Sequence, residues 1–153
     1  MANKMRHRYG AKNPVKAEVA SATVIDVGSL VYLYGNAVVP FSTKANASLA
    51  DVNDLFLGVA MQASANGETD PIRVATSGVF EFVIASTTVY LGNTILPVAG
   101  TASLENHTVT KGNTGTMTNG IGIAIPYDGT GVASAQTKVL VSIHSAIFDN
   151  MLA

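Results

Sequence analysis

Beyond residue 17 the chain is a series of short apolar segments rich in Val, Ile, Tyr and Phe, the composition that is typical of β-strands. Two of the connections carry Gly-Asn, at Gly35-Asn36 and Gly92-Asn93, and these residues tolerate the positive φ of tight hairpin turns. The expected strands are residues 18–26, 30–34, 37–41, 55–61, 72–75, 79–84, 87–91, 95–98, 120–125 and 137–143. The pattern predicts an all-β fold, a small β-sandwich or barrel-like domain of short antiparallel strands.

Three other segments lack the strand pattern. Residues 48–57 are the only candidate for a helix, because Ser48 can cap the first turn and Asp51 would lie near the positive end of the helix dipole. Residues 99–119 and 127–136 are rich in Gly, Thr, Ser and Asn, so we expect loops there. The first of these is long enough to suggest contact with a partner.

The basic residues are concentrated at the start of the chain. Five of the nine Lys and Arg residues lie within residues 1–16, which hold no Asp or Glu, whereas residues 17–153 hold four basic and all ten acidic residues. The sequence therefore predicts an extended basic arm, residues 1–16, in front of a single β domain, residues 17–153. We expect the arm to meet an acidic surface, although charge alone does not identify which.

The body carries very little charge for a chain of 153 residues. Charged residues make up 12% of the sequence and apolar residues 48%, so Ser, Thr, Asn, Gly and apolar atoms must supply most of the surface. A surface of this kind favours assembly with other subunits. No membrane partner is expected, because the longest apolar stretches are far shorter than the ~20 residues of a transmembrane helix.

Part of the sequence is repeated in the same order. Residues 31–40 match residues 89–97 with one residue removed, residues 57–60 match 121–124, and residues 72–75 match 137–140. The match suggests two pseudo-repeated halves, about 28–78 and 86–143, that each supply part of one β core. A chance similarity between short hairpins is the alternative, because hairpin turns use few sequence patterns.

The sequence offers no recognisable catalytic or metal-binding constellation. The three histidines, His7, His107 and His144, are scattered, and there is no cysteine. Zinc sites need several His, Cys or carboxylate ligands at short spacing, and hydrolases need a nucleophile with its base. We therefore expect a protein that is not an enzyme and that has no cofactor, no metal and no small-molecule substrate.

One acidic residue interrupts an apolar run. Glu81 lies between Phe80 and Phe82, and the alternation of a β-strand would place it on the opposite face from these two rings. We expect its side chain to point toward solvent or toward a contact with another subunit.

Several short motifs in order resemble the capsid decoration proteins of tailed phages, which are also called cement or head-stabilising proteins. The motifs are Val27-Gly28-Ser29-Leu30-Val31, Leu57-Gly58-Val59-Ala60, the segment from Pro71 to Phe80, Val89-Tyr90-Leu91 and Gly122-Ile123-Ala124. The resemblance covers roughly residues 18–145 and leaves the arm out.

This resemblance implies a structural protein of the virion. Members of that family are small β-rich subunits that form homotrimers on the outer surface of the capsid, where they tie neighbouring major capsid subunits together. The expected partners are the major capsid protein and other copies of the chain. On this hypothesis the arm binds the capsid through Lys4, Arg6, Arg8, Tyr9, Lys12 and Lys16, with Tyr9 as an aromatic anchor.

Two other functions fit the same pattern. A phage tail, fibre or receptor-binding module is also β-rich and trimeric, and its Thr- and Asn-rich loops would contact sugars. The basic arm would alternatively bind nucleic acid. Nucleic acid is the less favoured partner, because the body lacks the aromatic residues interleaved with basic ones on which bases stack.

Overall fold

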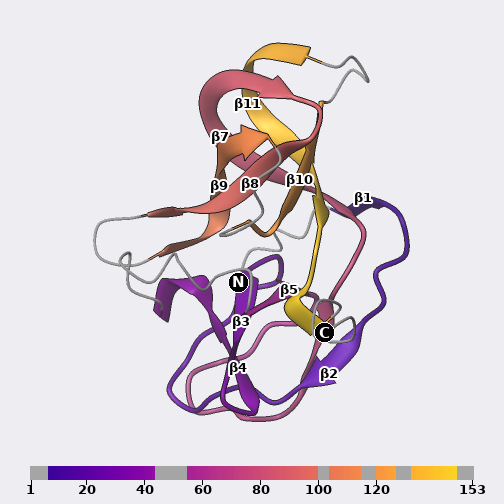
Figure 1. Ribbon diagram of the computed structural model, residues 1–153. Helices are drawn as coiled ribbons and strands as arrows, with labels where there is room; N and C mark the ends of the chain where they lie inside the picture. The colour runs from indigo at the N-terminus through magenta and orange to yellow at the C-terminus, as the bar shows by residue number, and fades with distance from the viewer. Residues whose placement is uncertain (1–6, 44–54, 100–103, 115–119, 127–131, 148–153) are drawn as a thin grey trace.

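The computed structural model describes residues 7–43, 55–99, 104–114, 120–126 and 132–147, and it is all-β (Figure 1). Its eleven strands form two sheets, which lie one above the other in Figure 1. The strands are β1 (His7–Tyr9), β2 (Val15–Ala17), β3 (Leu30–Tyr34), β4 (Ala37–Pro40), β5 (Phe56–Ala60), β6 (Ile72–Ala75), β7 (Val79–Tyr90), β8 (Asn93–Ala99), β9 (Leu104–Thr114), β10 (Gly122–Ile125) and β11 (Val132–Ile143). One 3₁₀-helix, η1 (Phe41–Thr43), follows β4.

The upper sheet closes on itself as a five-stranded ring. Its strands follow the order β7-β11-β10-β8-β9, and β9 returns to pair in parallel with β7 through Val83 with Thr108 and Ile84 with Val109. The ring is a small barrel, which removes the exposed edges of an open sheet. Strand β1 is added outside the ring, antiparallel to the start of β7.

The lower sheet follows the order β2-β6-β5-β3-β4, and its two outer strands also meet. Val19, just after β2, forms a parallel bridge to Val38 of β4. The Val38 amide donates to the Glu18 carbonyl at 2.8 Å, and the Ala20 amide donates to the Val38 carbonyl at 3.1 Å. The lower sheet and the ring within the upper sheet thus each contain five strands in the same order, and each is closed by a parallel contact between its outer strands.

The two rings also share their strand register. Val31 of β3 faces Gly58 of β5, and Ile95 of β8 faces Gly122 of β10. In the same way the amide of Gly28 donates to the Ala60 carbonyl at 2.8 Å, and the amide of Gly92 donates to the Ala124 carbonyl at 3.1 Å. Strands β2 to β6 therefore correspond one by one to strands β7 to β11.

This correspondence differs from the sequence match in its first part. The sequence match aligned residues 31–34 with residues 89–91. In the structure, however, β3 has the position in the lower sheet that β8, which begins at Asn93, has in the upper ring. Residues 57–60 and 121–124 do occupy equivalent positions. A division at about 28–78 and 86–143 therefore cuts β2 and most of β7 away from their rings.

The hydrophobic core is continuous between the rings. One cluster fills the lower ring with Val19, Val31, Val38, Leu57 and Val74 among its members. The larger cluster combines the alternate residues of the lower sheet with the interior of the upper ring. At their junction the fully buried ring of Phe41 lies 5.8 Å, centroid to centroid, from the rings of both Tyr32 and Phe56. The rings therefore fold as one body.

Most predicted strands are confirmed, and both predicted hairpin glycines have positive φ, 62° at Gly35 and 89° at Gly92. Three expectations are wrong. The supposed loops contain β9 and the first half of β11, the strands predicted at 79–84 and 87–91 are one strand, and residues 18–26 form only two isolated bridges. The candidate helix lies outside the described residues except for 55–57, of which Phe56 and Leu57 belong to β5.

Residues 7–16, which belong to the basic segment, pair with both sheets of the body. Strand β1 pairs with β7 in the upper ring, and β2 completes the lower ring by pairing with β6. Between them the Lys12 carbonyl accepts hydrogen bonds from the amides of Thr76 and Ser77 at 2.9 and 3.1 Å. Backbone pairing thus fixes this segment along the side of both rings (Figure 1).

None of the described elements is a helix of the length and apolarity that a bilayer span requires.

Candidate functional site

The structure distributes the predicted arm residues over different environments. Lys4 and Arg6 lie outside the described residues. Arg8 is paired internally, because its Nη2 donates to Oε2 of Glu81 at 2.8 Å. The pairing of β1 with β7 places Arg8 beside Glu81, and it places the ring of His7 edge-on against Phe80 with centroids 5.2 Å apart. At least one predicted capsid contact therefore holds the segment to its own body.

Glu81 is the acceptor for two cations. Its side chain is 4% exposed, and Lys138 Nζ lies 3.8 Å from the second carboxylate oxygen. The prediction that Glu81 faces solvent is wrong: the side chain does lie on the face opposite the core, but Arg8 and Lys138 cover it. A buried carboxylate needs such partners, because removing a charge from water is costly.

Tyr9 and Lys12 have side chains that are at least partly exposed, as the predicted contact with a capsid requires. Tyr9 is half exposed, and Lys12 is partly buried while its carbonyl is bonded to the body. The turn that follows Tyr9 and contains Lys12 begins at Gly10, whose φ is 85°, and includes Asn13 at 42°. The side chain of Asn13 donates to Ser77 Oγ at 2.7 Å, and its carbonyl accepts from Thr76 Oγ1 at 2.6 Å. These bonds hold Tyr9 and Lys12 in place.

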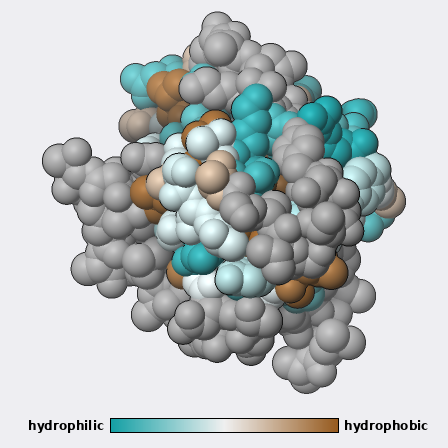
Figure 2. Space-filling model, turned by 90° about the horizontal axis from the view of Figure 1, so that it is seen from above, coloured by the Kyte–Doolittle hydropathy of each residue, from teal (hydrophilic) through white to brown (hydrophobic). Residues whose placement is uncertain are grey.

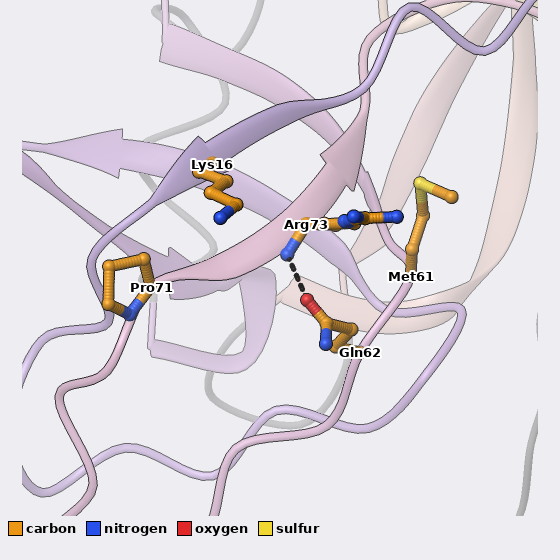
Figure 3. Close-up of a pocket in the computed structure, with 5 residues that line it drawn as sticks. All are labelled: Lys16, Met61, Gln62, Pro71 and Arg73. Carbon is orange, nitrogen blue, oxygen red and sulfur yellow. Dashed lines mark hydrogen bonds between the residues drawn. The ribbon is translucent and has the colours of Figure 1, made fainter.

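Lys16 belongs to a basic pocket that sequence reasoning missed. The pocket encloses about 360 Å³ and is lined by Lys16, Met61, Gln62, Pro71 and Arg73 (Figure 3). Lys16 of β2 and Arg73 of β6 are direct partners in the antiparallel pairing, so both side chains leave the same face of the sheet. No sequence signal indicated this pairing, since it depends on the register of two strands that are far apart in the chain.

The backbone hydrogen bonds of Arg73 decide which type of pair it forms with Lys16. Its carbonyl accepts from the Met61 amide at 2.8 Å, and its amide donates to Gln62 Oε1 at 2.7 Å. The backbone amide and carbonyl of Arg73 thus form their hydrogen bonds toward β5 and not toward β2. Lys16 and Arg73 therefore form a non-hydrogen-bonded pair, the type with the shorter separation between side chains. In the described parts of the chain neither cation forms an ion pair.

A second hollow of about 260 Å³ lies in the lower ring beside the β3–β4 hairpin. It is lined by Ala20, Ser21, Thr23, Tyr32, Tyr34, Val39 and Thr43. Tyr34 is two-thirds exposed, whereas the hydroxyl of Tyr32 lies 3.0 Å from Thr43 Oγ1, which itself donates to the Pro40 carbonyl. An aromatic face with several hydroxyl groups is suited to a polar, ring-shaped ligand such as a sugar.

Large apolar side chains are also exposed at the surface. They are Tyr9, Val24, Tyr34, Val83, Tyr90, Leu91 and Ile123. Leu91 and Ile123 lie on adjoining elements, because the Gly92 amide donates to the carbonyl of Ala124. Figure 2 shows apolar atoms at several separate places of the upper face, between paler and hydrophilic residues. Such exposure is consistent with contact between proteins.

The described residues contain no group of three or more His, Asp or Glu side chains that would hold a metal ion. His7 hydrogen-bonds through Nε2 to the Gly10 carbonyl at 2.9 Å and packs on Phe80, so it is part of the attachment of β1. The expectations that the protein is not an enzyme and has no cofactor stay predictions.

Comparison of the chain with protein-family models gave no match, and a search of curated proteins found no significant similarity.

Proposed function

We propose that the protein is a capsid decoration protein of a tailed phage, which binds the outer shell as a trimer and stabilises the contacts between major capsid subunits. The observation that carries this proposal is the exposure of large apolar side chains on a rigid all-β body with few charges. A surface of this composition is suited to permanent contact with other subunits.

The order of motifs in the sequence directs this general role toward a capsid shell. Two of the motifs lie in equivalent places of the two rings, because Gly58 corresponds to Gly122. A trimer would present each contact three times, so modest contacts would combine into firm attachment. The major capsid protein would supply acidic groups to the exposed cations of the N-terminal segment.

Co-sedimentation with expanded capsids of the parental virus that lack the decoration protein tests this proposal. Deleting residues 1–16 would remove β1 and most of β2, so its effect would mix folding with binding. The better variant replaces Lys4, Arg6, Lys12 and Lys16 by Gln and keeps Arg8, which is bonded to Glu81.

We expect the unaltered chain to sediment with the capsids as a trimer and the fourfold variant to bind at least tenfold more weakly. The difference should shrink as salt rises, because exposed charges are screened. A chain that stays in the supernatant at saturating concentration contradicts the proposal, whatever its oligomeric state by light scattering.

A receptor-binding module of a phage tail or fibre is the second candidate, and the hollow beside Tyr34 favours it. In that case the chain would bind polysaccharide from the host surface, and Tyr34→Ala would abolish binding because stacking on the exposed ring would be lost. Binding to capsids but not to polysaccharide would exclude this alternative.

A further inference from the structure

The basic pocket between β2 and β6 contains two cations and, among the described residues, no acidic partner for them. We propose that this pocket binds an acidic peptide segment of a partner protein, with Lys16 and Arg73 each taking one carboxylate. The inference goes beyond capsid attachment by naming the site and the chemistry of its ligand, and it rests on the proposed function only for the identity of the partner.

The two cations are held at opposite sides of the pocket. In Figure 3 the side chain of Lys16 extends toward the space beside Pro71 and Gln62, and the guanidinium group of Arg73 extends toward Met61. Their backbones are direct partners, and like charges in this position are unfavourable without a counter-charge. A pair of carboxylates spaced along a peptide would supply that counter-charge to both.

The remaining lining residues suit a peptide better than a small anion. The Gln62 carbonyl oxygen accepts from the Arg73 amide, which fixes the side-chain amide and leaves its NH₂ group as a donor in the pocket wall. Met61 and Pro71 add apolar surface for the residue between two acids. The volume of about 360 Å³ is several times that of one carboxylate group and falls at the lower end of ligand pockets.

The small number of cations favours a short acidic peptide over nucleic acid. A phosphate backbone requires a row of cations, but residues 17–153 hold only four basic residues against ten acidic ones. Among the described residues no aromatic side chain lines the pocket, so these residues offer bases no stacking surface. Two cations beside an apolar wall therefore match an acidic peptide.

The experiment is a titration of the ¹⁵N-labelled full chain with the peptide acetyl-Glu-Leu-Glu-amide, followed by amide chemical shifts. We expect saturable shifts at Lys16, Gln62 and Arg73, including the side-chain NH₂ of Gln62, with a dissociation constant on the order of 10 mM, because exposed ion pairs are weak. Lys16→Gln and Arg73→Gln should each weaken binding at least fivefold. Lys111→Gln is the matched control, because Lys111 lies in the upper ring, where its Nζ donates a hydrogen bond to the Thr88 carbonyl.

Three outcomes would overturn the proposal. They are the absence of localised shifts, equal shifts with acetyl-Gln-Leu-Gln-amide, and equal or tighter binding of a ten-nucleotide oligothymidylate at the same residues. Both Gln variants replace exposed side chains, so unchanged spectra elsewhere will show that they fold.

Capsid co-sedimentation of the same variants separates this inference from the proposed function. If the chain binds the peptide but does not bind capsids, the proposed function is contradicted and the peptide-binding pocket is supported. If the chain binds capsids but does not bind the peptide, the proposed function is supported and the peptide-binding pocket is contradicted.

Discussion

Gly58 and Gly122 occupy the same position in the two rings, and each lies against the backbone of the strand that follows it. A Cβ atom on Gly58 would overlap the Ala75 carbonyl oxygen of β6, and one on Gly122 would overlap the Ser142 carbonyl oxygen of β11. The requirement for glycine therefore comes from close contact between neighbouring strands, and it arises twice because the two rings share one strand order.

Gly58→Ala and Gly122→Ala should each lower the free energy of unfolding by about 3 kcal/mol, because the added methyl group forces two strands apart. Urea denaturation followed by circular dichroism measures the loss. Gly112→Ala is the matched control within a strand, since its methyl group would meet the movable side chain of Leu96 at 3.2 Å. A cost as large at Gly112 would contradict the explanation by backbone contact.

Arg8→Ala should lower the free energy of unfolding by about 1–2 kcal/mol, because it removes the 2.8 Å ion pair of the buried Glu81 carboxylate, whereas Lys138 lies farther away at 3.8 Å. Lys138→Ala should cost less than about 1 kcal/mol, since its ammonium lies at 3.8 Å and is mostly exposed. A double-mutant cycle of Arg8→Ala with Glu81→Gln isolates the pair. A coupling energy near zero would mean that this ion pair does not help to hold β1.

The turn glycines should differ in their tolerance of substitution. Gly35→Asn should change stability by less than about 0.5 kcal/mol, because φ is 62° and no atom lies within 4 Å of the added Cβ. Gly78→Ala should cost about 1–3 kcal/mol, since φ is 109° and its Cβ would press on the His7 ring at 3.3 Å.

Hydrogen exchange provides the local readout for Gly78→Ala. The amides of Thr76 and Ser77, which donate to the Lys12 carbonyl, should exchange faster in this variant than in Gly35→Asn. Unchanged exchange would show that the N-terminal segment stays attached without Gly78.

Phe41→Ala should lower the free energy of unfolding by about 3–5 kcal/mol, and Phe41→Leu by about 1 kcal/mol, because the ring fills the junction between the two rings of strands. Thermal unfolding by calorimetry measures both changes. Tyr34→Ala, on the exposed end of the same hairpin, should stay within about 0.5 kcal/mol. Two separate unfolding transitions in Phe41→Ala would show that the rings no longer fold together, whereas a single transition with little loss would contradict the role of this side chain.

The sequence was sufficient to predict those strands whose apolar residues alternate or cluster between turn residues. Strand β9 was not predicted because it is rich in Thr and Asn, and the ring closure buries Val109 although neither of its sequence neighbours is apolar. Residues 18–26 look like a strand for the opposite reason: Val19 and Ile25 are buried, but they are held by single bridges as the chain crosses the lower ring.

The candidate site was harder to predict, since its contacts depend on strand register. Glu81 gave a signal, an acid in an apolar run, but its partner Arg8 comes from a strand that nothing in the basic segment predicted. Lys16 was singled out for its charge, while Arg73 became its neighbour only through the pairing of β2 with β6. Local patterns identify such residues but not the contacts between distant segments.

The attachment of the N-terminal segment has a mechanical consequence. Strand β1 joins one ring and β2, a few residues later, is built into the other, so the start of the chain links both. A pulling force applied at His7 reaches the β2–β6 pairing only after β1 has left β7 and the bonds to Thr76 and Ser77 have broken. The short outer strand therefore separates from β7 before the pairing of β2 with β6 carries load.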